Sequence, residues 1–287
     1  MTSLPRYERI LCEDPEITSF VRLYYVHRSD DPTAEERITY YPNYCTTLNI
    51  YRNDQVRWTD LSRTHTHAPN AGFNQLLVSR FDKTREIVMK GRFDKLTIVF
   101  WPLGINRFLS TNLSKIGQEH FAFFDHFGPP FESVLEEVFN SPKITEKRAL
   151  LDTFFKEQLQ SFQAPKLQQA IDSWLGAAES LSVDAMANRL AISRKTLLRQ
   201  FRKHLMLSPS EFKSILKFRK ALHHAQTSPR FKGLSDLAYT ADYYDQSDLN
   251  AHFKIKTGMT PKQLFQQIQT IDEGLFWNYR RVPKVQD

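Results

Sequence analysis

Two histidine pairs are the residues whose spacing first suggests chemistry. His65 and His67 are two positions apart, so a strand would point both imidazoles to one side, as a metal site requires. No carboxylate follows in residues 68–72, so we expect a pair of histidines in a loop and no metal. His223 and His224 are adjacent, and on a helix they would diverge by about 100°. They cannot share one metal ion.

No other pattern of a catalytic site is present. The sequence has no nucleophile elbow, phosphate-binding loop or paired metal motif. We therefore expect no enzymatic activity and no cofactor. Cys12 and Cys45 lie far apart, which fits a reducing, cytoplasmic location. The first residues have no apolar signal core and no run approaches eighteen apolar residues, so no membrane partner is expected.

The last third of the chain carries an internal repeat. Leu197 and Phe201 of the first copy recur as Leu249 and Phe253 of the second, each 52 positions further on. Upstream the offset is 51, so the second copy should have one more residue in its turn. The four-residue spacing predicts a helix, Arg194–Leu205 in the first copy, with one face toward a core. Each copy is expected to form a helix, a tight turn and a second helix.

Polar residues predict where these helices begin. Ser182 is expected to cap the first helix of the first copy, and Ser235 that of the second. The later helix of the second copy should start near Asp245. Both copies close with a capping box that has proline at the first helical position, Ser208–Glu211 and Thr260–Gln263.

The segment between the copies, Pro209–Thr227, is helix-compatible throughout. About eighteen residues at 1.5 Å each span ~27 Å, near the ~34 Å between successive major grooves on one face of DNA. Such a linker would place two helices in neighbouring grooves, with modest bending of the DNA. Its Lys213, Lys217, Arg219 and Lys220 are expected to face solvent.

Positive charge is concentrated in this part of the chain. The net charge is +7, and residues 165–270 hold sixteen Lys and Arg against eight Asp and Glu. The remaining residues hold 23 against 24. Basic charge confined to one segment favours a polyanionic partner over a merely solvated surface.

Two runs of residues carry a family resemblance: Ser193-Arg194-Lys195-Thr196-Leu197 with Ser208-Pro209, and Tyr243-Tyr244-Asp245-Gln246-Ser247 with Gly258-Met259-Thr260-Pro261. On these residues, Pro165 to Gln269 resembles the DNA-binding domain of the AraC/XylS family of transcription regulators. The resemblance implies double-stranded DNA as partner, and RNA polymerase as well if the protein is an activator. Ala191, Met206 and Asp242 stand where the family usually has glycine.

The resemblance also implies which side chains contact DNA. Base reading is expected from Lys195, Thr196, Leu198, Arg199, Gln246, Ser247 and Asn250. Phosphate contacts are expected from Arg194, Arg202, Lys203, Lys213, Lys217, Lys254 and Lys262, and from Arg219. Ala251 stands where the family usually has a basic residue, so the second unit should carry less sequence information. Neutralising roughly six phosphates predicts a slope of about −5 in log K against log[salt].

The N-terminal part is expected to be β-rich. Short runs of β-branched and aromatic residues, separated by Asn, Asp, Gly and Pro, predict many strands within about residues 1–110. They favour an antiparallel barrel or sandwich. The residues Phe100-Trp101-Pro102-Leu103-Gly104 and Asp125-His126-Phe127-Gly128 loosely resemble the cupin-like sensory domain of some of these regulators. A small-molecule effector is therefore a second expected partner. Six aromatic side chains are candidates to line its pocket: Tyr24, Tyr25, Tyr40, Tyr41, Trp58 and Trp101.

Helical periodicity returns within about residues 131–162. The stripes Phe131–Phe139 and Leu150–Phe162 predict two helices that either pack on the barrel or pair with a partner subunit, with packing favoured. They are also candidates to couple ligand binding to DNA binding. The expected organisation is an α+β chain: a β-rich sensing or oligomerisation domain at 1–163, an all-α domain of two helix-turn-helix units at 165–270, and an unassigned tail at 271–287. Monomer and homodimer both remain open.

Three classes of function fit these features. The first is a sequence-specific transcription regulator modulated by a small molecule. The second is a metal-dependent cupin enzyme with an accessory DNA-binding domain, and the third is an architectural protein that binds the DNA backbone alone. The repeated helix-turn-helix pattern favours the first. The effector, the operator, and activation as against repression are not encoded in these patterns.

Overall fold

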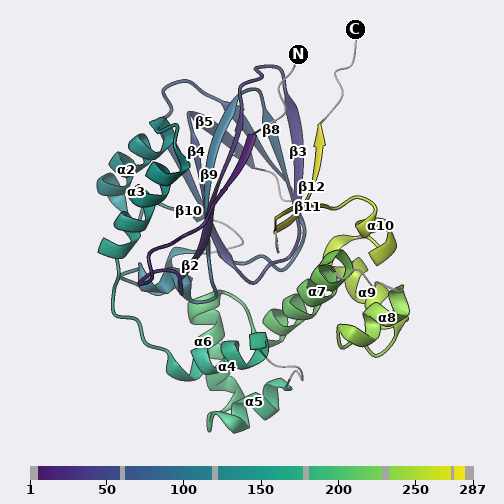
Figure 1. Ribbon diagram of the computed structural model, residues 1–287. Helices are drawn as coiled ribbons and strands as arrows, with labels where there is room; N and C mark the ends of the chain where they lie inside the picture. Colours follow the sequence, from purple (N-terminus) through teal and green to yellow (C-terminus); the bar gives the residue numbers. More distant parts are fainter. Residues whose placement is uncertain are drawn as a thin grey trace.

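Figure 1 shows the computed structural model, which describes residues 6–58, 62–117, 122–176, 181–227, 233–272 and 275–281. Its N-terminal part is built on two β-sheets and its C-terminal part on helices. The predicted α+β class, with a β-rich N-terminal part and a helical C-terminal part, is confirmed.

Each sheet has six strands in the described part of the chain. In spatial order the first sheet contains β1 (Arg6–Ile10), β2 (Val21–Ser29), β9 (Phe93–Phe100), β4 (Thr46–Arg52), β7 (Phe73–Val78) and β10 (Ala122–Phe123). The second contains β11 (Gln269–Asp272), β12 (Leu275–Arg281), β3 (Glu35–Tyr40), β8 (Arg85–Lys90), β6 (Ser62–His67) and β5 (Asp54–Trp58). Neighbouring strands pair antiparallel except β6 and β8, which are parallel. The expected barrel or sandwich is therefore not purely antiparallel.

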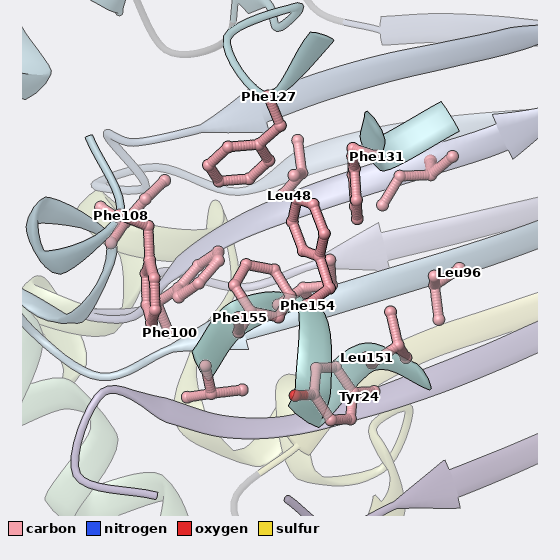
Figure 2. Packing of buried hydrophobic residues seen from close by; sticks show 14 of the residues in the cluster. Tyr24, Leu48, Leu96, Phe100, Phe108, Phe127, Phe131, Leu151, Phe154 and Phe155 are labelled. Carbon is pink, nitrogen blue, oxygen red and sulfur yellow. The ribbon is translucent and has the colours of Figure 1, made fainter. Parts of the chain in front are cut away.

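The first sheet lies between two cores. Alternate side chains of a strand point to opposite faces, so Tyr25 of β2 packs between the sheets while Tyr24 faces the other side. There α2 (Gly128–Asn140) and α3 (Ile144–Glu157) cover the sheet. Figure 2 shows Phe131 and Phe154 facing each other within this layer, with ring centroids 4.7 Å apart. The two helices therefore pack on the sheet, which was the favoured one of the two expectations for them.

The structure corrects the expectation that His65 and His67 lie in a loop. Both belong to β6, which pairs with β5 and β8 although it lacks the apolar alternation of a typical strand. His65 is 1% exposed, stacks on the ring of Tyr51, and has Nδ1 2.8 Å from Asp54 Oδ2. The carboxylate partner comes from the preceding strand, and His67 is exposed at the strand end.

Besides α2 and α3, the described residues form nine further helices. They are η1 (Gly104–Arg107), α1 (Leu113–Ile116), α4 (Pro165–Gly176), α5 (Val183–Arg189), α6 (Arg194–Leu205), α7 (Pro209–Thr227), α8 (Leu234–Thr240), α9 (Gln246–Thr257) and α10 (Pro261–Phe265). The predicted limits of α6 and α7 are confirmed to the residue. The turn between α8 and α9 is one residue longer than that between α5 and α6, as the change of offset predicts.

Three of the four expected helix caps are present, and the helix expected to start near Asp245 begins at Gln246. The Ser182 side chain accepts from Ala185 N, and Asp245 caps α9 in the same manner. The boxes Ser208–Glu211 and Thr260–Gln263 have both reciprocal hydrogen bonds. The prediction for Ser235 is wrong because the cap position lies two residues earlier, at Gly233, which has no side-chain acceptor.

The three positions where the family usually has glycine all adopt left-handed backbone. The φ angles are 50° at Ala191, 59° at Met206 and 62° at Asp242. Residues with a Cβ pay a steric cost there, smallest for Asp, whose side chain can bond locally. These turns therefore keep the left-handed backbone even though a Cβ makes that conformation less favourable.

The end of the chain returns to the first half. Beyond α10, β11 and β12 form a hairpin, and β12 pairs antiparallel with β3, from Trp277 opposite Tyr40 to Arg281 opposite Glu36. In Figure 1 this strand, in yellow, lies beside β3, between it and the edge strand β11. Part of the unassigned tail therefore completes a sheet built mainly from residues before 100.

The N-terminal part contacts the helix-turn-helix segment through η1 and through loops. Asn106 Nδ2 donates to the carbonyl of His204 at 3.0 Å, Arg80 pairs with Glu211 at 2.7 Å, and Thr84 Oγ1 donates to the carbonyl of Lys256 at 3.0 Å. By contrast, α2 and α3 cover the face of the first sheet away from α7–α10 (Figure 1). These contacts to α6, α7 and α9 therefore come from η1 and from loops. Of the candidate coupling stripe Leu150–Phe162, α3 ends at Glu157, and Phe162 beyond it reaches α6, with its ring 5.1 Å from that of His204.

No helix in the described residues is both long and apolar enough to cross a membrane.

Candidate DNA-binding surface

Helix α6 is fixed by its buried face and leaves its opposite face outside. Leu197 and Phe201 have no exposed area, and the Phe201 ring lies 5.6 Å from that of Phe212 on α7. Because α-helical residues repeat every 3.6 positions, this packing turns Lys195 and Arg199 away from the core. Both are exposed. Two cations four residues apart therefore stand on one free face.

The other two residues expected to read bases on α6 are less available. Thr196 and Leu198 are half-buried. The Thr196 hydroxyl lies 3.0 Å from the Ser193 hydroxyl, which also caps the helix by accepting from Thr196 N. Thr196 is thus engaged in the N-terminal turn, while Leu198 offers only apolar contact.

Helix α9 repeats the arrangement in the second unit. Leu249 and Phe253 are fully buried, and the Phe253 ring lies 4.9 Å from that of Phe218 on α7. Gln246 and Ser247 are exposed and Asn250 is half-buried. Gln246 Oε1 accepts from the Ser235 hydroxyl at 3.2 Å, so the amide is oriented by α8. Ala251 is exposed but offers only a methyl group.

A polar network that the sequence reasoning missed fixes α9 against α7. His252 has Nε2 2.8 Å from the Ser214 hydroxyl and Nδ1 2.7 Å from the Tyr243 hydroxyl. Lys217 Nζ lies 3.1 Å from Asp248 Oδ2 and 4.0 Å from the centre of the Tyr243 ring. Burial, together with the nearby charges of Lys256 and Lys217, lowers the pKa of His252 to about 4. The four-residue spacing of Asp248 and His252, on one helix face, was the available signal.

The cations expected to contact phosphate fall into two groups. Five are exposed: Arg194, Arg202, Lys203, Lys254 and Lys262. Of these, Arg194 pairs with Asp184 at 3.2 Å. Lys213 donates to the Leu181 carbonyl and Lys217 pairs with Asp248, so both are engaged within the protein.

Arg219 corrects the expectation of a solvent-facing linker helix. It is 7% exposed, because the N-terminal part packs over this face of α7. Burial lowers its pKa to about 10, which Tyr44 and Cys45 partly offset. An arginine in this position cannot contact DNA phosphate in the present arrangement.

A groove of about 1530 Å³ separates the two units. Its walls come from α4, α5, α7, α9 and from β2, and they include Arg22, Lys217, Lys220, Asp242 and Asp248. Lys220 pairs with Asp242 at 2.7 Å, so this wall is less positive than its lysines alone suggest. The exposed cations among those expected to contact phosphate lie instead on α6, α9 and α10.

The described residues hold no group of three or more His, Cys, Asp or Glu side chains placed to bind a metal ion. Of the six aromatic candidates for a ligand pocket, Tyr25, Tyr40 and Tyr41 line a cavity between the sheets, and Trp101 lines the groove. Tyr24 instead belongs to the core, where its hydroxyl donates to Asp152 at 2.7 Å. The side chain of Trp58 lies outside the described residues.

The repeated, capped units can now be compared with known proteins. Residues 186–267 match the model of a family described as a helix-turn-helix domain. Within 89 residues the chain is 29% identical to the HTH-type transcriptional activator RhaS of Escherichia fergusonii. This segment is an AraC-type helix-turn-helix domain. The AraC-type domain spans α5 to α10, and the family resemblance of the C-terminal residues is confirmed; the cupin-like resemblance is not tested by these matches.

The RhaS match is confined to part of the chain, and solved structures superpose on most of it with low TM-scores. The match to RhaS covers 31% of this chain and 31% of that protein, so the chain spans about a third of its length. Apo ToxT of Vibrio cholerae superposes with a TM-score of 0.43 at 11% identity, covering 92% of this chain and 96% of ToxT. Unsaturated fatty acid bound ToxT gives 0.42 at 12%, covering 91% and 93%. Values this low say nothing about what the present chain binds.

Proposed function

We propose that this protein is a sequence-specific, DNA-binding transcription regulator whose activity responds to a small molecule bound by its N-terminal part. The observation that carries the proposal is the pair of capped units whose second helices, α6 and α9, are fixed to one linker helix. Nineteen residues of α7 at 1.5 Å each give a spacer of ~28 Å. That length suits two successive major grooves on one face of DNA.

The base-reading role is proposed mainly for α6. Lys195 and Arg199 are exposed on its free face, and arginine binds the O6 and N7 atoms of guanine through two parallel hydrogen bonds. Gln246, Ser247 and Asn250 on α9 can read bases by hydrogen bonding, but Ala251 cannot. The first unit should therefore carry most of the sequence information.

We assign the two proposed roles to successive parts of the chain. We assign DNA binding to 165–270 and effector sensing to 1–163, with the paired tail strand contributing to the second sheet. Double-stranded DNA is the principal partner, and RNA polymerase is a further one if the protein activates transcription. A metal-dependent enzyme has less support, because the described residues gather no set of metal ligands and His65 is engaged by Asp54.

The proposal is tested by selecting binding sites from a random-sequence DNA pool and measuring variants on the selected site. Arg199→Ala should weaken specific binding by roughly 5- to 150-fold, the equivalent of about 1–3 kcal/mol, and weaken binding to random DNA much less. Lys203→Ala is the matched control, because a phosphate contact should lower both affinities alike. Equal losses for Arg199→Ala on both DNAs would favour an architectural protein.

A further inference from the structure

One short segment of the N-terminal part contacts both helix-turn-helix units. Residues 79–84, the crossover segment, connect β7 of the first sheet to β8 of the second. Arg80 pairs with Glu211 on α7 at 2.7 Å, and the Thr84 hydroxyl donates to the Lys256 carbonyl on α9 at 3.0 Å. The first contact lies where the first unit joins α7, and the second lies in the last turn of α9.

The contact at Glu211 supports the turn between α6 and α7. Glu211 Oε2 accepts from Ser208 N at 2.7 Å, so one carboxylate oxygen completes the capping box at the start of α7. Its other oxygen, Oε1, accepts from Arg80 at 2.7 Å. A charge-assisted hydrogen bond of this kind is stronger than one between neutral groups. Arg80 therefore fixes the carboxylate that sets where α7 begins relative to α6.

The contact at Lys256 supports the end of α9. The last carbonyl groups of a helix have no partner within the helix itself. The Lys256 carbonyl accepts from the Thr84 hydroxyl and, at 3.3 Å, from Thr84 N. Burial lowers the pKa of Lys256, while the charges of Asp82 and Glu211 oppose this, so the two contacts of the crossover segment share one charged region.

The crossover segment also borders the space between the two sheets. Phe81 lines a cavity of about 50 Å³ there, together with Val78 and Arg85 at the two ends of the segment. The Phe81 ring centre lies 6.5 Å from that of Tyr40 on β3, and the Phe81 carbonyl accepts from Asn43 N at 3.0 Å. Asn43 belongs to the connection from β3 to β4, which likewise crosses between the sheets. A change in the separation of the sheets would therefore displace the crossover segment, because the segment spans them.

We propose that the crossover segment positions the second unit for DNA binding, and that the N-terminal part regulates DNA binding through it. The inference rests on the proposed function, since it names the route from the N-terminal part to the two reading helices, α6 and α9. Lys195, Arg199 and Gln246 are exposed, so the reading faces stay open in this arrangement. The segment therefore holds an arrangement that can bind DNA. Helix α7 sets the distance between the units, and the segment sets the orientation of α9.

Binding titrations of the full chain on two DNAs test this role. The first DNA is the site selected from random sequence, and the second is the same site with the half bound by α9 scrambled. The ratio of the two affinities measures what the second unit contributes. Arg80→Ala should lower this ratio about fivefold or more, and Arg80→Lys, which keeps the charge, should retain most of it. Affinity for the scrambled site should not change in either variant, because the first unit stays intact.

The matched control is Arg37→Ala, which removes another arginine ion pair of the N-terminal part and should leave the ratio unchanged. An unchanged or increased ratio in Arg80→Ala would overturn the positioning role, and so would equal losses on both DNAs. If Arg80→Ala fails to fold, Thr84→Val and Thr84→Ser make the same comparison at the other contact. Only Thr84→Val, which removes the hydroxyl donor, should lower the ratio, and equal ratios in these two variants would contradict the proposal.

Amide hydrogen exchange of the free full chain tests the crossover segment without DNA. In Arg80→Ala, exchange should become severalfold faster in the last turn of α9, residues 254–257, although Arg80 pairs with α7. Exchange in α5 should stay the same. Unchanged exchange in α9 would overturn the link between the two contacts. Failure to select any DNA site would remove the regulator proposal and leave the exchange result standing.

Discussion

At the scale of single residues, the left-handed turn positions show where the chain tolerates strain. Ala191 has φ 50° in the turn before α6 and no side-chain hydrogen bond to offset its Cβ. Ala191→Gly should raise the free energy of unfolding by about 0.5–1 kcal/mol, the left-handed penalty less the added flexibility of the unfolded chain. Denaturant unfolding measures it, with Ala185→Gly inside α5 as a control that should destabilise.

Met206 has the same backbone conformation, but its side chain packs against the core between the first sheet and helices α2 and α3. Met206→Gly should therefore gain less than Ala191→Gly or lose stability, because relief of strain is offset by lost packing. An equal gain at both positions would contradict a packing role for Met206.

At the scale of elements, the contact between η1 and α6 predicts a pH effect. His204 of α6 is 6% exposed, and its Nδ1 lies 3.3 Å from Asn106 Oδ1. Burial lowers its pKa from 6.5 to about 4, with Lys203 adding repulsion. Between these two values the unfolded state binds a proton that the folded state does not. Stability must therefore fall as the pH is lowered from about 6.5 to 4.

Unfolding curves collected from pH 7 to pH 4 measure this dependence. His204→Gln should flatten it in part, since burial also lowers the pKa of His252 to about 4 and that of His27 to about 3. His67→Gln, at an exposed position, is the control and should leave the slope unchanged. An unaltered slope in His204→Gln would show that protonation of this histidine does not contribute to the pH dependence of stability.

The elements also show what sequence patterns can predict. The limits of α6 and α7 followed from local patterns, the four-residue apolar spacing of α6 and the capping box that opens at Ser208. Strand β6 was missed because Ser62–His67 alternates no apolar residues, and its place depends on pairing with β8. The pairing of β12 with β3 joins residues more than 230 positions apart, which no local pattern encodes. Arg219 was misplaced for the same reason, because its burial depends on the docked sheets.

At the scale of the whole molecule, the structure leaves fewer cations available to contact DNA phosphate than the sequence alone predicts. Arg219 is buried, and Lys213 and Lys217 have partners within the protein. Among the cations expected to contact phosphate, four are exposed and have no described ion pair: Arg202, Lys203, Lys254 and Lys262. Four phosphate contacts predict a slope of about −4 in log K against log[salt], rather than −5. Binding titrations from low to high salt give this slope, and a value near zero would remove the electrostatic contribution.

The central claim is that α7 holds two reading helices at a fixed spacing. The most direct test inserts five base pairs between the two halves of the selected site, which turns the second half to the opposite face of the DNA. If both units bind through a rigid linker, affinity should fall to that of a single half-site, and insertion of ten base pairs should not rescue it because ~28 Å cannot span two turns. Full affinity after the five-base-pair insertion would contradict the claim.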